Sequence, residues 1–198
     1  MKQVFHKIVG GGNQIYVWKV TSLLDELCKN PILSPLELKE ANTIKSEKRK
    51  TEFIACRIIL KNLFDCELEL KHHKSGRPYI KEAKHISISH SKGYIAIALG
   101  KENMGIDIEQ PQEKILKLIP RILSETELIQ FQQKPSIEHA SKLWGTKESV
   151  LKYLGDKNLN YREDIKIDKN SAIYLDLNFD VYFETVEEMI LTYVMRKT

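Results

Sequence analysis

The 198-residue sequence has little cysteine and no paired cysteine motif. Its three cysteines, Cys28, Cys56 and Cys66, are odd in number, and none belongs to a C-x-x-C pair. A disulfide framework or a zinc knuckle is therefore not expected. We expect the three thiols to be reduced and partly buried, as free cysteines usually are.

Long hydrophobic runs are also missing. The longest apolar stretches are residues 94–99 and 189–195, and Thr192 interrupts the second. Both are much shorter than the roughly 20 residues that a membrane-spanning helix needs. The first residues, MKQVFHKIVGGG, lack the apolar core of a signal peptide. The sequence thus predicts a cytoplasmic protein that has no membrane partner.

No large excess of one charge is present, because 31 basic and 27 acidic residues give a net charge of only +4. This balance is too mild to indicate a nucleic-acid partner, and we expect none; salt-sensitive retention of DNA or RNA would contradict this expectation. A small positive charge does suit an anionic ligand or an acidic partner protein. Hydrophobic residues make up 42% and charged residues 29%, which excludes a disordered chain or a fibre and predicts one globular fold.

Several common motifs are absent. The sequence contains no P-loop, no G-x-G-x-x-G and no G-x-S-x-G. The glycines at 10–12 precede a predicted strand instead of following one, so we interpret them as a flexible N-terminal turn. His72 and His73 are adjacent and lack the spacing of a helical metal site, which favours an exposed pair.

Helices and hairpins are both predicted. Capping patterns at Ser34 and Ser124 predict helices over 35–41 and 125–133, and two longer helices are expected over 46–64 and 136–154, the last ending at Gly155. Apolar–polar alternation and turn residues predict strands at 15–20, 86–89, 94–99, 104–109, 173–183 and 190–194. This mixture favours an α+β fold with antiparallel hairpins over alternating β-α units.

Asp107 and Glu109 are the first candidates for chemistry. Their spacing places both carboxylates on one face of a strand. Two such charges raise each other's pKa unless a cation lies between them, and carboxylate oxygens suit Mg²⁺. The alternative is an ordinary solvent-exposed strand face.

The predicted helix 136–154 carries a second group. Lys147 lies within its apolar stripe, where a lysine needs a partner. Glu148 and Lys152 share one edge of that stripe. Considered alone, these two residues could form an ordinary helix-surface ion pair.

Two further features remain ambiguous on their own. The hydroxyl-rich strand end at 87–91 can present donors to a phosphate, or it can be a simple polar hairpin turn. Arg57 lies on the apolar stripe of helix 46–64, where its stem can pack while the guanidinium reaches water.

The order of these motifs resembles one family. G-R-P-Y-I, I-S-I-S-H-S-K-G-Y, G-I-D-I-E and W-G-T-K-E-S-V-L-K follow one another between about residues 46 and 155. This order is similar to that of the 4′-phosphopantetheinyl transferase superfamily, most closely its larger, monomeric, surfactin-synthetase-activating (Sfp-like) type. The segment after Gly155 matches nothing that we can identify.

The resemblance implies a fold and a reaction. The fold would be α+β, with two pseudo-symmetric halves over 1–103 and 104–198, each a small antiparallel sheet packed on a helix, and an active site in the cleft between them. The N-terminal half would bind the phosphates and adenine of coenzyme A, and the C-terminal half would carry the metal and catalytic motifs. The enzyme would transfer 4′-phosphopantetheine from coenzyme A to a serine hydroxyl of an apo acyl or peptidyl carrier protein and release adenosine 3′,5′-bisphosphate. Carrier proteins of fatty-acid, polyketide or nonribosomal peptide biosynthesis would be its partners.

The resemblance also implies roles for individual residues. Asp107, Glu109 and Glu148 would bind Mg²⁺, with Mn²⁺ as the alternative. Glu148 would act as general base, and Lys152 would contact the pyrophosphate and protonate the leaving phosphate. The coenzyme A-binding residues would be Arg49, Arg57, Arg77, Ser89, His90 and Lys152. Trp144 and Lys147 would be structural.

One alternative to the enzyme is a non-catalytic coenzyme A- or nucleotide-binding module of the same fold. Retention of Asp107, Glu109, Glu148 and Lys152 argues against such a module, because a binding module need not keep metal ligands. The sequence leaves open which carrier protein is used, and which of Lys48, Arg49 and Lys50 reaches the 3′-phosphate.

Overall fold

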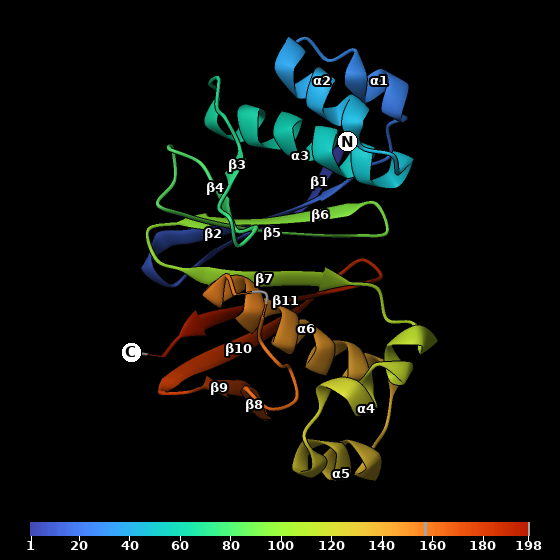
Figure 1. The fold of residues 1–198 in the computed structure, drawn as a ribbon, viewed down its shortest axis with the longest axis vertical. Coiled ribbons are helices and arrows are strands. Elements are labelled where there is room, and N and C mark those ends of the chain that lie inside the picture. Colours follow the sequence, from blue (N-terminus) through green and yellow to red (C-terminus); the bar gives the residue numbers. More distant parts are fainter. Residues whose placement is uncertain (157, 198) are drawn as a thin grey trace.

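A computed structural model describes residues 1–156 and 158–197. Its first sheet has four antiparallel strands in the order β1-β2-β6-β5. These strands are β1 (Lys2–Val9), β2 (Asn13–Lys19), β5 (His85–Ser91) and β6 (Tyr94–Gly100). A two-stranded ribbon of β3 (Lys71–His72) and β4 (Pro78–Tyr79) lies beside this sheet (Figure 1).

The β5–β6 hairpin has a turn whose geometry follows from its sequence. Lys92 and Gly93 both have positive φ, at 50° and 81°, as a two-residue hairpin turn that matches strand twist requires. The turn sets the register that pairs Ser89 with Ala96. The alternating serines of β5 therefore all lie on one face of this strand.

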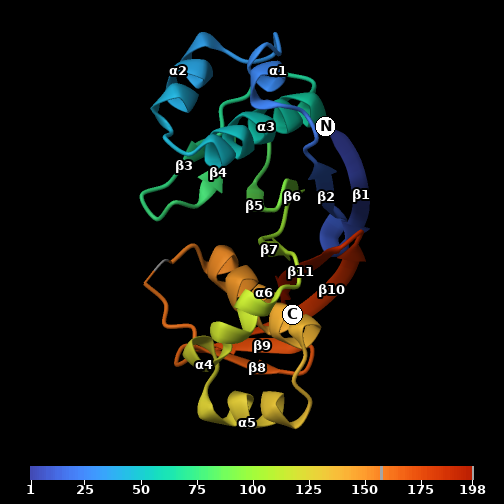
Figure 2. The same cartoon turned by 90° about the vertical axis from the view of Figure 1, so that its right-hand side faces the viewer.

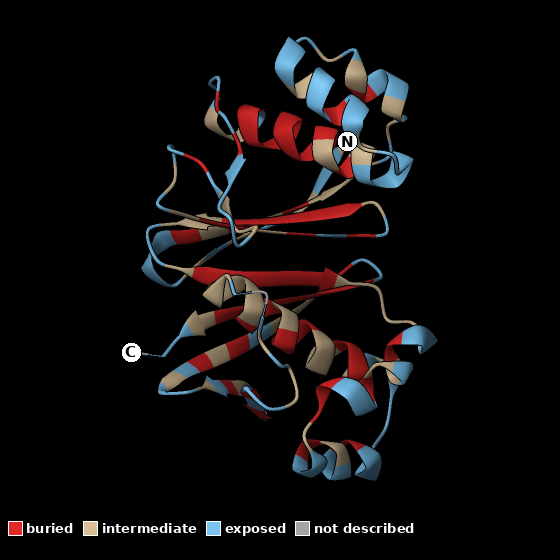
Figure 3. Cartoon of the chain, in the orientation of Figure 1, coloured by how far each residue is buried: buried red, intermediate tan, exposed pale blue. Residues whose placement is uncertain are grey.

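Three helices cover one face of the first sheet (Figure 1). They are α1 (Leu24–Cys28), α2 (Pro35–Thr43) and α3 (Glu47–Phe64). Ser34 caps α2 in a full capping box with Glu37, and Ser46 caps α3. Residues of α3 such as Ile58 and Ile59 are buried against the sheet, which makes α3 the central helix of this half (Figure 3).

The second sheet has five antiparallel strands in the order β7-β11-β10-β9-β8. The strands are β7 (Met104–Glu109), β8 (Ile165–Asp168), β9 (Ser171–Tyr174), β10 (Leu177–Val186) and β11 (Met189–Arg196). The connecting helices and helical turns are η1 (Gly10–Gly12), η2 (Glu113–Lys117), α4 (Ile119–Ile122), α5 (Glu125–Gln133) and α6 (Ile137–Leu154). Helix α6 lies across the sheet, and α4 and α5 lie at the end of the molecule farthest from α1 and α2 (Figures 1 and 2).

Two glycines let α6 approach this sheet closely. A Cβ atom on Gly105 of β7 would lie 1.8 Å from the carbonyl oxygen of Ser149, and one on Gly145 of α6 would lie 2.5 Å from Oγ1 of Thr192. Neither position tolerates a side chain without a shift. The close contact brings the Glu148 and Lys152 side of α6 to strand β7.

The two sheets pack against each other through apolar residues of β2 and β6 on one side and of β7 and β11 on the other. Their edge strands, β5 and β7, also meet. Ile106 and Ile108 of β7 point their N–H groups away from β11, toward Ser87 and Ser89 of β5. The two serine Oγ atoms accept these hydrogen bonds at 3.2 Å each. The serine side chains thus provide hydrogen-bond acceptors for backbone N–H groups of the edge strand β7 that would otherwise be buried and unpaired.

Further contacts join the halves. Lys7 of β1 pairs with Glu184 of β10 at 2.5 Å, and Lys19 of β2 pairs with Glu187 at 2.6 Å. The buried Asn13 side chain exchanges two hydrogen bonds of 3.2 Å with the backbone of Glu102, in the link between the sheets. The link is therefore tied to the first sheet.

The predicted fold class is confirmed, since helices and antiparallel sheets are mixed and the two main sheets form two halves. The predicted long helices and the 86–99 hairpin are present. One strand over 173–183 was wrong: Leu175 has a φ of 50°, and the chain turns there between β9 and β10. The glycines at 10–12 form a turn, but this turn joins β2 to strand β1, which was not predicted.

None of the described helices is long and apolar enough to cross a membrane.

Candidate active site

The candidate site lies where β5, β7 and α6 converge. Ser89 is buried and donates its hydroxyl proton to Oδ1 of Asp107 at 2.8 Å. Lys152 of α6 donates to the same Oδ1 at 2.7 Å and to Oγ of Ser89 at 2.8 Å. Three residues that are far apart in the sequence therefore share one polar contact.

Asp107 is buried, so the alternative of an ordinary solvent-exposed strand face is wrong. Its residue is only 5% exposed, and its second oxygen, Oδ2, is buried without a hydrogen-bond partner among the described residues. A buried carboxylate oxygen without a partner is costly. This oxygen is accordingly available to a ligand that supplies positive charge.

Glu109 lies two residues along the same face of β7. Its Oε1 accepts hydrogen bonds from Ser91 and from the side-chain amide of Gln112, both at 3.1 Å. Gln112 was not among the sequence candidates, and nothing in its sequence context indicates this contact. The serine ladder of β5 continues here, because Ser91 meets Glu109 as Ser89 meets Asp107.

Glu148 approaches from α6. Its pKa is raised by burial first and by the negative charge of Asp107 second. Oε1 of Glu148 accepts a 2.6 Å hydrogen bond from the hydroxyl of Tyr161. Burial, followed by the charge of Glu148, raises the pKa of Tyr161, so this phenol stays a donor. No motif in the sequence indicates this role for Tyr161.

Lys152 contacts the strand and not its helical neighbour. The simple alternative was a surface ion pair with Glu148, but the ammonium group binds Asp107 on β7. The Lys152 side chain is 23% exposed and that of Asp107 is 7% exposed. This pair is therefore largely shielded from solvent, unlike a surface pair on one helix.

The carboxylates of the site suit a divalent cation. Within residues 1–156 and 158–197, no three His, Cys, Asp or Glu side chains are already arranged as a metal site. The chemistry is nevertheless suitable, since Asp107 offers an unpartnered buried oxygen and Glu148 lies within its electrostatic range. Hard carboxylate oxygens are the ligands that Mg²⁺ prefers. The residues present thus fit a magnesium ion once Lys152 releases Oδ1.

Lys147 has the partner that its position required. Its ammonium group is fully buried and binds both oxygens of Glu127 on α5, at 3.2 and 3.1 Å. The carbonyl oxygens of Tyr161 and Ile165 complete its hydrogen bonds at 2.9 and 2.5 Å. Glu127 was visible in the sequence as a capping-box residue of Ser124, and this capping role is also present.

His90 lies on the opposite face of β5 from Ser89 and is not brought to Asp107. Its Nδ1 lies 3.1 Å from Oε2 of Glu52 on α3. Burial would raise the pKa of Glu52, but the His90 hydrogen bond and the charges of Lys48 and Arg49 lower it. His90, Lys48 and Arg49 therefore form a second basic group near the start of α3, whereas Lys50 binds Asn42 of α2 at 3.0 Å.

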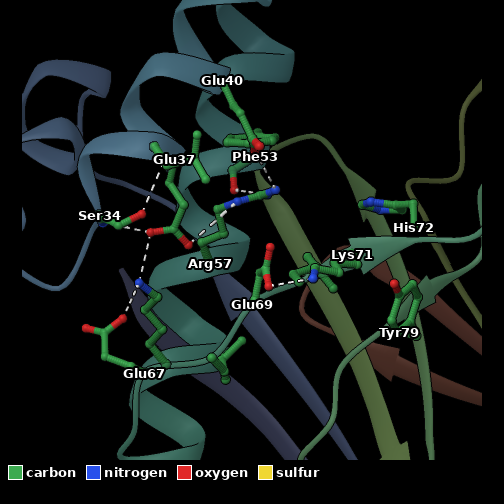
Figure 4. A pocket seen from close by; sticks show the side chains of 14 residues that line it. Ser34, Glu37, Glu40, Phe53, Arg57, Glu67, Glu69, Lys71, His72 and Tyr79 are labelled. Atoms are coloured by element: carbon green, nitrogen blue, oxygen red, sulfur yellow. Dashed lines mark hydrogen bonds and ion pairs between the residues drawn. The ribbon is translucent and has the colours of Figure 1, made fainter.

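Arg57 is separate from both groups. Figure 4 shows its guanidinium between α2 and α3, in a pocket of about 690 Å³ that also contains Glu37 and Glu40. These carboxylates lie 3.8 and 3.6 Å from the guanidinium, which stacks on Phe53. The residue is only 5% exposed, and it lines this pocket. The role of Arg57 in binding coenzyme A stays a prediction.

Arg77 lies at the junction of the two halves. Its guanidinium donates to Oδ1 of Asn103, and Asn103 in turn donates to the carbonyl of Tyr153 at 2.9 Å. Arg77 also lines a pocket of about 340 Å³ with Lys84 and His85. This pocket is basic, and it reaches the end of α6 at Gly155.

Comparison with known proteins identifies a family for the site-bearing region. Residues 103–189 match the model of the 4′-phosphopantetheinyl transferase superfamily. The match confirms the resemblance seen in the sequence. It contains Asp107, Glu109, Glu148 and Lys152, and it extends beyond Gly155 into the segment that the sequence motifs had left unassigned.

The chain is also similar to three proteins that are named 4′-phosphopantetheinyl transferases. The chain is 31% identical over 105 residues to the 4′-phosphopantetheinyl transferase gsp of Aneurinibacillus migulanus, covering 52% of this chain and 44% of that protein. It is 34% identical over 85 residues to a 4′-phosphopantetheinyl transferase of Bacillus subtilis (40% and 38% covered). It is 30% identical over 94 residues to 4′-phosphopantetheinyl transferase Sfp of Bacillus subtilis strain 168 (45% and 42% covered). The chain spans less than half the length of these relatives.

Proposed function

We propose that this protein is a 4′-phosphopantetheinyl transferase that moves the phosphopantetheine arm of coenzyme A to a serine hydroxyl of an apo acyl or peptidyl carrier protein. The observation that carries the proposal is the convergence of Asp107, Glu148 and Lys152 at the contact between the two sheets. These residues lie in the region that matches the superfamily.

The acidic residues would hold a divalent cation, Mg²⁺ or Mn²⁺. Asp107 and Glu148 would be its principal ligands and Glu109 the third, because all three carboxylates gather near the β5–β7 edge. When bound, the cation would neutralise charge on the pyrophosphate of coenzyme A. Lys152 would then exchange its contact with Asp107 for a phosphate oxygen.

The transfer itself breaks one P–O bond and forms another. The carrier serine oxygen attacks the β-phosphorus of coenzyme A, and the bond from this phosphorus to the bridging oxygen breaks. The leaving group is adenosine 3′,5′-bisphosphate. Glu148 would accept the serine proton, and Lys152 would donate a proton or a hydrogen bond to the leaving phosphate. Such catalysis consists mainly of positioning and charge stabilisation.

Coenzyme A would be bound by both halves. Ser89 and Lys152 would contact the pyrophosphate, since they already share one polar contact. Arg77 would lie beside the adenine and phosphate, in the basic pocket with Lys84 and His85. His90 of β5 and Arg49 at the start of α3 would reach the 3′-phosphate, a role that the family resemblance also implies for Arg57.

The two halves would divide this work. Residues 1–103 would supply most of the contacts to the phosphates and adenine of coenzyme A, and residues 104–198 would supply Lys152, the metal ligands and the catalytic groups. We further propose that the protein acts as a cytoplasmic monomer. The net charge of +4 would favour an acidic carrier protein.

Alanine variants test this assignment. Asp107→Ala, Glu109→Ala and Glu148→Ala should each abolish transfer to an apo carrier while circular dichroism shows a folded protein. Calorimetry should show that the wild type binds coenzyme A and that His90→Ala binds it more weakly. Full activity of Glu148→Ala would remove this residue from the catalytic role. Coenzyme A binding without transfer to any carrier by the wild type would favour the non-catalytic binding module instead.

A further inference from the structure

Tyr161 reaches the candidate site from the segment that follows α6. Its hydroxyl donates a 2.6 Å hydrogen bond to Oε1 of Glu148. Its ring packs against Trp144 of α6, with ring centroids 5.7 Å apart and planes tilted by 46°. Glu148 is therefore held by a side chain that comes from outside its own helix.

The backbone of Tyr161 is held independently of its hydroxyl. The carbonyl of Tyr161 accepts a 2.9 Å hydrogen bond from the buried ammonium group of Lys147. Lys147 also binds Glu127 and the carbonyl of Ile165, so its position is fixed from α5 and β8. The motif residues Trp144 and Lys147, expected to be structural, thus determine where the tyrosine hydroxyl lies.

This arrangement leaves Glu148 with one engaged oxygen. Tyr161 occupies Oε1, and no hydrogen bond from the described residues occupies Oε2. A carboxylate with one oxygen held in this way loses less rotamer freedom when the other binds a ligand. Oδ2 of Asp107 is another oxygen of the site that has no hydrogen-bond partner among the described residues, and it is buried.

We propose that Tyr161 is a positioning residue that holds Glu148 in the orientation needed to share a divalent cation with Asp107. This inference rests on the proposed function, because it assigns the same carboxylates to the cation. The tyrosine touches neither substrate nor cation and acts through Glu148.

Tyr161→Phe tests the proposal, because it removes only the hydroxyl and keeps the ring that packs on Trp144. Tyr174→Phe is the matched control, since Tyr174 is half-buried like Tyr161 but lies on β9, outside the site. Mn²⁺ binding to each purified protein, without coenzyme A, is followed by electron paramagnetic resonance. Removing a hydrogen bond to a metal ligand typically weakens metal affinity about 10- to 100-fold, and we expect this loss for Tyr161→Phe alone.

Transfer kinetics give a second readout. A positioning role predicts a lower kcat for Tyr161→Phe, with unchanged KM values for coenzyme A and carrier protein and an unchanged thermal midpoint. Equal Mn²⁺ affinity in wild type and Tyr161→Phe would overturn the proposal, as would a loss that Tyr174→Phe reproduces. If the wild type transfers nothing, the proposed function fails by that result, while the Mn²⁺ titration still decides the role of Tyr161.

Discussion

The Lys147–Glu127 ion pair offers a demanding test of the structure. Lys147 is fully buried, and the Glu127 side chain is 6% exposed. Burial lowers the pKa of Lys147 despite the opposing charge of Glu127. The substitution Lys147→Met keeps much of the side-chain volume but leaves Glu127 as a buried carboxylate without its cation.

The expected loss follows from this geometry. Removing one partner of a buried ion pair destabilises a protein by about 3–5 kcal/mol. At roughly 2–4 °C per kcal/mol for a chain of this size, the thermal midpoint should fall by about 6–20 °C. The double variant Lys147→Met/Glu127→Gln should lose less than the sum of the two single variants, because it leaves no unpaired charge.

Urea unfolding followed by circular dichroism measures this loss. Lys142→Met is the matched control, since Lys142 pairs with Glu138 on the exposed side of the same helix at 2.6 Å. This control should leave the midpoint almost unchanged. A loss below about 1 kcal/mol for Lys147→Met, where a buried pair should lose several, would refute the buried ion pair.

Three other predictions follow from the same structure. Burial would raise the pKa of Glu37, but hydrogen bonds from Lys61 and Ser34 lower it below its ordinary value of 4.5. Glu37→Gln should therefore destabilise the protein at pH 7. In urea unfolding, the difference in stability between wild type and variant should shrink as the pH falls below 4.5. Gly105→Ala, whose Cβ would meet a backbone oxygen at 1.8 Å, should lower both the thermal midpoint and transfer activity, whereas Gly10→Ala, whose new Cβ meets only a flexible methionine side chain, should change neither. Arg49→Ala should weaken coenzyme A binding in calorimetry, and an unchanged affinity would move the 3′-phosphate site away from the start of α3.

Local sequence signals predicted local structure well. The helices that follow Ser34, Ser46, Ser124 and Ser136 begin where their caps indicate, because capping depends on residues within one turn. The 86–99 hairpin follows from alternation and a Lys-Gly turn. The β9–β10 turn was missed because hydrophobic alternation continues across Leu175, so periodicity alone cannot locate it.

Contacts between distant segments were harder to predict. The family motifs indicated Asp107 and Lys152, but their direct contact joins strand β7 to helix α6 across 45 positions. Tyr161 and Glu127 carry no motif signal for their contacts with Glu148 and Lys147. Such partners depend on how α5 and the segment after α6 pack, which a single sequence does not reveal.

Intact-protein mass spectrometry tests the central claim most directly. The enzyme is mixed with an apo carrier protein, coenzyme A and Mg²⁺, and the carrier is weighed with and without EDTA. A carrier whose acceptor serine is replaced by alanine serves as the control. The account predicts one added phosphopantetheine arm on the serine carrier, lost with EDTA and absent from the alanine carrier. No mass gain on fatty-acid, polyketide or peptidyl carriers, despite bound coenzyme A, would contradict it.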